Sequence, residues 1–318
     1  MNDRAKVLII TVNFRQAECT RQFLDSASRL ESFAGCNVLI VDNNSEDGSI
    51  SRIRQTIPEF RNVELLPSSQ NRGYFGAARW ALDQYLERHS LPGWVAVCNN
   101  DIEFDDPLFL VNLFEKDPAS TGVIAPSIIS GLTEHDANPS LRKRPSAFRM
   151  LRYRLWLANY YAMWFKQWLS PTVRKIRHTK TRHPTSRGTA AGQAGNQQIY
   201  APHGSFVIFS RKFFETGGFI DDGFFLYAEE FSIAEMSIRL RLPVIHEPTL
   251  RVRHKEGQST GRMLSRESYL HQLNGFRYAL ARYKYSYPEL VRGALNARTS
   301  IGVDRGTSPN LPAVGDGV

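Results

Sequence analysis

Three clusters of amide and carboxylate side chains directly follow apolar runs of the sequence. They are Asn13, Asp42-Asn43-Asn44 and Asn99-Asn100-Asp101. Side chains of these types bind polar ligands through hydrogen bonds, and they are also common in turns, where they bond to the local backbone. Any one cluster is explained best by turn chemistry. Three of them at corresponding places along the chain favour a ligand-binding cleft instead.

An acidic pair and a lone histidine lie further along the chain. Glu229 and Glu230 stand at the expected start of a helix, where negative charge is favoured by the helix dipole. His254 follows a short strand-like run, and a lone histidine is more often structural than a metal ligand. By themselves these residues do not establish a reaction.

Apolar runs and helical patterns alternate along the first part of the chain. Runs that predict strands lie at residues 6–14, 37–43, 63–67, 94–99 and 123–129. Helical spacing lies between them, for example from Gly76 to Arg88, and Asp106-Pro107 is a typical helix start. The alternation predicts an α/β fold with a mostly parallel sheet and flanking helices. Because ligands bind beyond the carboxyl ends of such strands, the polar clusters are expected to meet at one edge.

The second part of the chain predicts fewer elements. A strand from Tyr200 to Phe209 is followed by a helix capped by Ser210, then by a helix that begins near Glu229. Two short strands are expected around residues 244–245 and 251–253, and a final helix around residues 266–283.

Composition places the chain among ordinary globular proteins. Of the 318 residues, 42% are hydrophobic and 22% are charged, which predicts one or two domains. Cys19, Cys36 and Cys98 have no paired spacing, so we expect no disulfide or zinc framework, and a reducing cytoplasm. The first apolar run is too short for a signal peptide, and no run is long enough to span a bilayer, which predicts a soluble or peripheral protein.

The positive charge is concentrated in one segment. Ala137 to Phe214 contains fifteen Lys and Arg and no Asp or Glu, whereas the formal net charge of the whole chain is +9. The rest of the chain is therefore mildly acidic, and one basic insert produces the high isoelectric point.

Six motifs, in order, resemble those of the inverting, nucleotide-sugar-dependent glycosyltransferases with a GT-A fold, in the bacterial group that includes rhamnosyltransferases. They are VNF, VLIVDNNSEDGS, NRGYFGAAR, VCNNDIEF, GSFVIFSR…GGFIDDGFFLYAEEFSI and RVRHKEGQS. Each motif is weak alone, but six in the family's order, from Val7 to about Ser259, make a specific match. The resemblance implies transfer of a sugar, with inversion, from a dTDP- or UDP-sugar to an acceptor hydroxyl.

The resemblance also implies roles in donor binding. Asp42 corresponds to the acid that accepts a hydrogen bond from the nucleotide base, and Asn71 and Gly73 belong to the loop that covers the base and ribose. The residues expected to contact the donor are Asn13, Asp42, Asn71, Gly73, Asn99, Asn100 and Lys255.

Metal and catalytic roles are implied in the same way. Asn99-Asn100-Asp101 stands in the place of the family's Asp-x-Asp motif, so Asp101 and His254 are expected to bind Mn²⁺ or Mg²⁺. Only one anionic ligand remains in this motif, so metal affinity is expected to depend on the bound donor. Glu230 corresponds to the general base, with Glu229 holding the acceptor or orienting its partner. His203-Gly204-Ser205 resembles the acceptor-side loop.

Four segments follow from this interpretation. Residues 1–131 form the nucleotide-sugar-binding half, 132–198 the basic aromatic helical insert, 199–285 the acceptor and catalytic half with the last helix, and 286–318 a partly disordered C-terminal segment.

The insert is expected to be helical. Its predicted apolar stripe is Phe148, Leu151, Leu155, Ala158, Ala162, Phe165 and Leu169. Aromatic residues with flanking cations favour docking on an anionic membrane surface at the inner face of the plasma membrane. Packing within the protein and a homodimer surface are the alternatives, and nucleic acid is not expected as a partner.

Membrane docking would suit a lipid-linked glycan acceptor and a role in cell-surface polysaccharide synthesis. A catalytically silent nucleotide-sugar-binding scaffold is the alternative function, because the metal motif is rich in Asn. A dehydrogenase is disfavoured because no G-x-G-x-x-G motif is present.

Overall fold

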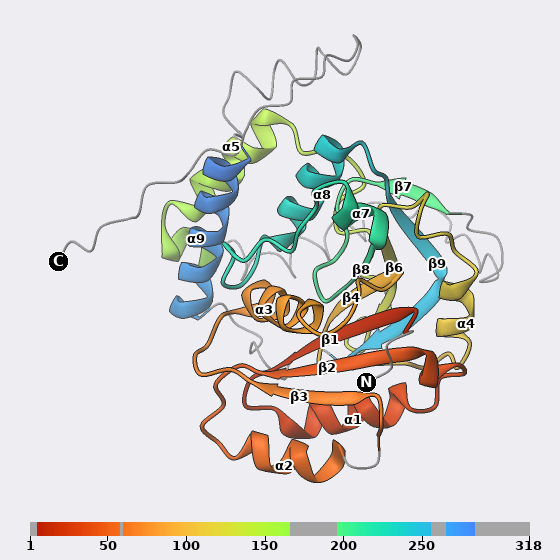
Figure 1. Ribbon diagram of the computed structural model, residues 1–318. Helices are drawn as coiled ribbons and strands as arrows, with labels where there is room; N and C mark the ends of the chain where they lie inside the picture. Colours follow the sequence, from red (N-terminus) through yellow and green to blue (C-terminus); the bar gives the residue numbers. More distant parts are fainter. Residues whose placement is uncertain (1–4, 58–59, 166–195, 256–264, 284–318) are drawn as a thin grey trace.

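The structure, a computed structural model, describes residues 5–57, 60–165, 196–255 and 265–283. Within these residues one nine-stranded sheet runs in the order β3-β2-β1-β4-β8-β6-β9-β5, with β7 paired to β9 (Figure 1). Parallel ladders hold most of the paired residues, and helices lie on both faces. The predicted α/β fold with a mostly parallel sheet and flanking helices is therefore confirmed.

The first four strands of the sheet are parallel. They are β1 (Val7–Asn13), β2 (Cys36–Asp42), β3 (Val63–Pro67) and β4 (Trp94–Asn99). β1 and β2 are almost completely buried, which is why their sequences are continuous apolar runs. In the ladders Asn13 lies opposite Asp42, and Val12 lies opposite Asn99, so the three polar clusters do end at one edge.

The remaining strands complete the sheet with mixed directions. β8 (Phe206–Ser210) is antiparallel to both β4 and β6 (Val123–Ser130), and β7 is Gln197–Ile199. β9 (Val244–His254) is a single strand, so the prediction of two short strands there was wrong. Its ladder with β6 shifts register between Pro126, which pairs with Glu247, and Ser127, which pairs with Arg251. The intervening residues of β9 are accommodated as an irregularity within one strand.

A two-residue strand, β5 (Ile102–Glu103), has a large consequence for the site. It pairs antiparallel with the end of β9, so that Ile102 lies opposite His254. The end of the VCNNDIEF motif is thereby placed beside the end of the RVRHKEGQS motif.

Helices cover the two faces of the sheet and form two apolar cores. α1 (Ala17–Ala27), α2 (Ser49–Thr56) and α4 (Phe109–Phe114) lie on one face. A short 3-10 turn, η1 (Phe33–Gly35), lies between α1 and β2. α3 (Tyr74–Leu86), α7 (Arg211–Glu215) and α8 (Glu229–Leu240) lie on the other. Cys19, Cys36 and Cys98 are buried and do not form disulfides with one another.

A third apolar cluster joins the insert to the last helix. α5 (Ala147–Leu157) and α9 (Arg266–Arg282) lie side by side in Figure 1. The ring of Tyr153 meets Phe276 edge-on with centroids 5.0 Å apart, and the Tyr269 hydroxyl donates to the Leu157 carbonyl at 2.8 Å. The face of α5 that carries Tyr153 and Leu157 therefore packs within the protein, against α9.

The predicted apolar stripe is not the face that packs. The chain leaves the helical conformation at residues 158–159, and the residues before the break that belong to the third apolar cluster are Met150, Tyr153 and Leu157. Phe148 and Leu155, which belong to the predicted stripe, are 70% and 63% exposed. Leu169, the rest of the insert to residue 195 and the segment 286–318 lie outside the described residues. No helix in the described part of the chain is long and apolar enough to cross a bilayer.

Candidate active site

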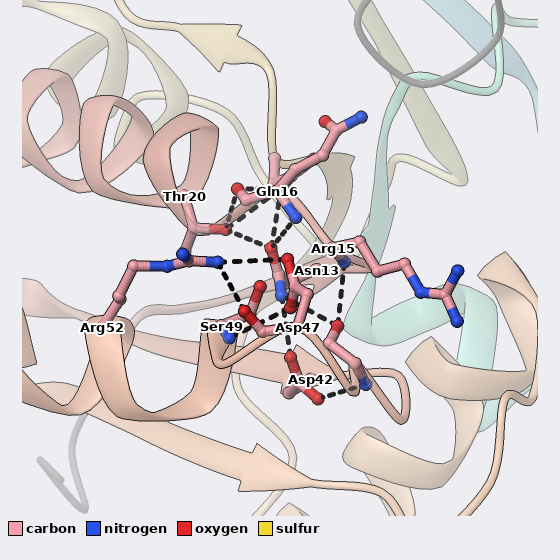
Figure 2. A network of polar contacts seen from close by, with 10 residues as sticks. Asn13, Arg15, Gln16, Thr20, Asp42, Asp47, Ser49 and Arg52 are labelled. Carbon is pink, nitrogen blue, oxygen red and sulfur yellow. Dashed lines mark hydrogen bonds and ion pairs between the residues drawn. The ribbon is translucent and has the colours of Figure 1, made fainter.

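A buried hydrogen-bond network ties together the ends of β1, β2 and β4 (Figure 2). The Asn13 amide donates to Asp42 Oδ2 at 2.8 Å, and the Ser45 backbone N–H donates to Asp42 Oδ1 at 2.8 Å. The Asn100 amide donates to Thr20 Oγ1 at 3.0 Å and to Asn13 Oδ1 at 3.3 Å. Asn13, Asp42 and Asn100 therefore fix the loops around the rim. Their direct contact with a donor stays a prediction.

Asn43 fastens a second loop to the end of β2. Its amide nitrogen donates to Asn71 Oδ1 at 2.8 Å and to the Gly73 carbonyl at 3.0 Å, and its Oδ1 accepts from the Arg72 backbone N–H at 2.8 Å. Gly73 has φ 73°, and a Cβ there would lie 2.1 Å from the Phe225 carbonyl oxygen. Only glycine fits this position. The loop predicted to cover the donor is thus held from both sides.

Asp101 and His254 meet at the end of this edge. Asp101 Oδ1 lies 3.0 Å from His254 Nε2, and the two residues are only 5% and 8% exposed. Asn99 Nδ2 lies 3.4 Å from the same ring nitrogen. The pairing of β5 with β9 brings these two residues together, and their predicted role as metal ligands stays a prediction.

The pair fits two ligands of a divalent cation. Two neighbouring ligands of an octahedral ion, each about 2.1 Å from it, are about 3 Å apart. Asp101 Oδ1 is buried and, apart from its 3.0 Å contact with His254 Nε2, accepts no hydrogen bond within the described residues. Among those residues no group of three or more His, Cys, Asp or Glu could hold a metal. The described residues by themselves would therefore supply only part of a coordination shell.

The acidic pair begins α8. Glu230 Oε1 lies 3.4 Å from the Gly204 backbone N–H, whereas Glu229 is buried. Burial, and then the neighbouring charge of Glu230, raise the pKa of Glu229 to about 8. At neutral pH Glu229 is therefore largely protonated, and the two carboxyl groups differ in their chemistry.

The raised pKa of Glu229 predicts a dependence of stability on pH. The unfolded chain releases this proton near pH 4.5 and the folded chain near pH 8, so the free energy of unfolding falls as pH rises between these values. Glu229→Gln, which cannot ionise, is expected to melt at the same temperature as the unchanged protein at pH 4.5. At pH 8 it should melt higher, by roughly 2–4 °C for each kcal/mol recovered.

Thermal melts across this pH range, without nucleotide or metal, measure the effect. Glu87→Gln, at an exposed position after α3, is the control and should follow the unchanged protein. Parallel melting curves for Glu229→Gln and the unchanged protein would show that Glu229 ionises normally.

The turn His203-Gly204-Ser205 lies between the pair Asp101 and His254 and the acidic pair at the start of α8. The His203 N–H donates to Asn138 Oδ1 at 2.7 Å, and the Tyr74 hydroxyl donates to the Gly204 carbonyl at 3.1 Å. The rings of His203 and His254 have centroids 6.2 Å apart, while Gly204 contacts Glu230. This turn therefore connects Asp101 and His254 with Glu230 in one site.

Tyr74 lies close to the acidic residues of this site. Burial, followed by the nearby Cys98, Glu229, Asp101 and Glu230, raises the pKa of its hydroxyl well above the usual value. The hydroxyl is thus kept as a hydrogen-bond donor to the turn. Motif comparison missed this role, although Tyr74 stands inside the NRGYFGAAR motif.

The predicted basic residues near His254 are engaged elsewhere. Lys255 Nζ lies 2.8 Å from Gln22 Oε1 and 3.5 Å from Glu103 Oε2, and Arg253 donates to Glu134 at 2.8 Å. Contact between Lys255 and a donor stays a prediction.

Comparison with a solved structure agrees with the fold. The structure resembles the crystal structure of GalNAc-T7 with UDP, GalNAc and Mn²⁺, with a TM-score of 0.58 and 14% identity. That match covers 89% of this chain and 50% of the other, and it supports the GT-A fold alone.

Sequence comparison gives the family. An N-acetylglucosaminyl-diphospho-decaprenol L-rhamnosyltransferase of Mycobacterium tuberculosis is 25% identical, over 80% of this chain and 77% of that protein. The model of glycosyl transferase family 2 matches residues 7–218, which contain the strand-end clusters, the donor loop and the turn at Gly204. The chain therefore belongs to glycosyl transferase family 2.

Proposed function

We propose that this glycosyltransferase is metal-dependent and inverting, and that it transfers a sugar from a dTDP- or UDP-sugar to a hydroxyl of a lipid-linked glycan. The observation that carries the proposal is the meeting of Asp101, His254 and Glu230 around one turn. A catalytically silent scaffold would have no need for a separate carboxylate beside such a pair.

The donor half of the reaction uses the first edge of the sheet. The loop at Asn71 and Gly73, which Asn43 fastens, would cover the nucleoside, and Asp101 and His254 would hold Mn²⁺ or Mg²⁺. When bound, the metal would neutralise negative charge on the departing diphosphate. Because the described residues supply few ligands, the donor diphosphate is expected to complete the shell.

The acceptor half centres on Glu230. Its carboxylate takes the proton of the acceptor hydroxyl while that oxygen forms a bond to the anomeric carbon. The bond from this carbon to the diphosphate oxygen breaks on the opposite face, and the nucleoside diphosphate leaves. A single displacement of this kind inverts the anomeric configuration. Glu229, which is largely protonated, can donate a hydrogen bond to the acceptor or to Glu230 without adding a second negative charge.

The activity can be tested with purified protein. The probes are dTDP-rhamnose and a panel of UDP-sugars as donors, with N-acetylglucosaminyl-diphospho-polyprenol as acceptor, with and without Mn²⁺. Acceptor-dependent release of nucleotide with inverted product supports the proposal. Binding of nucleotide without turnover for any donor and metal would support the scaffold alternative.

The exposed face of the insert supports a membrane-bound acceptor. Near residues 148–165 the exposed apolar side chains are Phe148, Leu155, Tyr161 and Phe165, and the exposed cations are Arg149, Arg152 and Arg154. The opposite face of α5 approaches the site, since burial and then the charge of Glu230 raise the pKa of Tyr153. We therefore place one face of α5 on anionic lipid and the other beside the acceptor, at the cytoplasmic face of the membrane.

Phe148→Glu with Leu155→Glu is expected to release the protein from vesicles that contain anionic lipid. Two apolar anchors are lost, and each added charge opposes an attraction worth about 1 kcal/mol per basic residue. Co-sedimentation with phosphatidylglycerol vesicles measures the effect, and high salt should weaken binding of the unchanged protein. Leu86→Glu on α3, where the side chain is also exposed, is the control. Equal sedimentation of all proteins would rule out docking through α5.

A further inference from the structure

The backbone before the acidic pair is held in an unfavourable conformation. Tyr227 and Ala228 have φ values of 71° and 73°, and neither is a glycine. Residues with a Cβ avoid this region, so the surrounding structure must hold them there. Because Glu229 and Glu230 follow directly, this turn sets the direction in which both carboxyl groups enter the site.

Helix α9 presses against this turn. Gly275 is buried in the middle of α9, and a Cβ there would lie 2.6 Å from the Tyr227 carbonyl oxygen. Any side chain would therefore displace either the helix or the turn. The ring of Phe225 also stacks on His271 of α9, with centroids 4.7 Å apart and planes at 18°.

Two tyrosines near the end of α9 hold the start of the same loop. The Tyr278 hydroxyl donates to Asp221 Oδ1 at 2.9 Å, and the Tyr283 hydroxyl donates to Asp221 Oδ2. The Gly223 backbone N–H donates to Oδ1 at 3.1 Å. Asp221 is almost completely buried, so both of its oxygens depend on these partners.

We infer that α9 is a clamp that holds residues 221–228 and thereby positions Glu230 for proton transfer. Gly275, Tyr278 and Tyr283 are positioning residues in this proposal. The region matched by the family model ends at residue 218, so the clamp lies outside it. The inference rests on the proposed role of Glu230 as the base.

The first test is Gly275→Ala in the full chain, with Asn274→Ala as its matched control. Asn274 is the preceding, exposed residue, so both changes introduce alanine into the same turn of the helix. Gly275→Ala is expected to lower kcat for transfer at least 10-fold while the Kd for UDP with Mn²⁺ stays within about 2-fold. Asn274→Ala should leave both unchanged.

A milder variant covers the case in which Gly275→Ala does not fold. Tyr278→Phe with Tyr283→Phe removes only the two hydroxyl donors to Asp221. Faster hydrogen exchange in residues 221–228, a lower kcat and a shifted acid limb in the pH profile of kcat/KM are expected. A merely structural role would lower the melting temperature but leave the pH profile and kcat per folded molecule unchanged, and that result would overturn the clamp.

The clamp and the proposed function fail in different ways. If Glu230→Gln keeps full turnover, Glu230 is not the base and the proposed function is wrong. If Glu230→Gln loses turnover but the double tyrosine variant keeps the wild-type kcat and exchange rates, only the clamp is wrong.

Discussion

Glu230→Gln is expected to lower kcat for sugar transfer by about 10²- to 10⁴-fold, the usual contribution of a general base. The amide has nearly the same shape as the carboxylate but cannot accept the proton of the acceptor hydroxyl. The contact between Gly204 and the Oε1 position can persist, so the turn at His203-Gly204-Ser205 should keep its place. The loss should therefore appear in kcat and not in the affinity for the nucleotide.

Two measurements separate this chemistry from damage to the fold. Acceptor-dependent nucleotide release gives kcat, and titration with UDP and Mn²⁺ gives nucleotide affinity, which should stay within a few-fold. Glu229→Gln is the matched comparison, because its parent side chain is already largely neutral at pH 7 and the change should cost much less. Turnover by Glu230→Gln equal to that of the unchanged protein would assign the base to another residue.

The edge where the three polar clusters meet could be predicted from sequence for a simple geometric reason. Parallel strands share one direction, so their carboxyl ends lie together whatever the details of packing. Asn13, Asp42 and Asn99 follow this rule. The rule does not say which side chains face a ligand, and the structure shows that Asn13 and Asp42 bond to each other and to neighbouring residues of the rim.

Other parts of the site depend on contacts that leave no local pattern. The meeting of Asp101 with His254 needs the two-residue strand β5, which is too short to produce a periodic signal. Only the resemblance to the family indicated it. Asn138 accepts a hydrogen bond from the turn His203-Gly204-Ser205, and no sequence pattern predicted this contact because Asn138 lies in an irregular segment.

Periodicity failed in α5 because apolar residues occur on more than one side of this helix, with arginines between them. Phe148 and Leu155 define one stripe, and Met150, Tyr153 and Leu157 define another. The 3.6-residue period fits both, so it cannot show which one packs. Contact with α9 buries the second stripe and leaves the first exposed. In β9, the shifted register with β6 accommodates the residues between the two short strands that the sequence predicts.

Asp101→Asn is expected to raise the Mn²⁺ concentration for half-maximal turnover by at least about 10- to 100-fold, since even partners of metal ligands contribute this much. Asp101 is the single anionic member of the pair with His254, and no larger acidic or histidine cluster exists in the described residues to replace it. An amide oxygen binds a divalent cation more weakly than a carboxylate does. Metal affinity should also rise when UDP is present, because the diphosphate supplies ligands in addition to Asp101 and His254.

Titration of turnover with Mn²⁺, and of metal binding with and without UDP, measures both effects. Asp105→Asn is the matched control, because it removes one negative charge nearby from an exposed side chain without touching the pair. It should leave the Mn²⁺ requirement unchanged. Full turnover of the unchanged protein in excess chelator would contradict the metal proposal, and Asp101 with His254 would then be a buried ion pair that braces β5 against β9. In that case stabilisation of the leaving diphosphate would have to come from cations such as Lys255, released from Glu103.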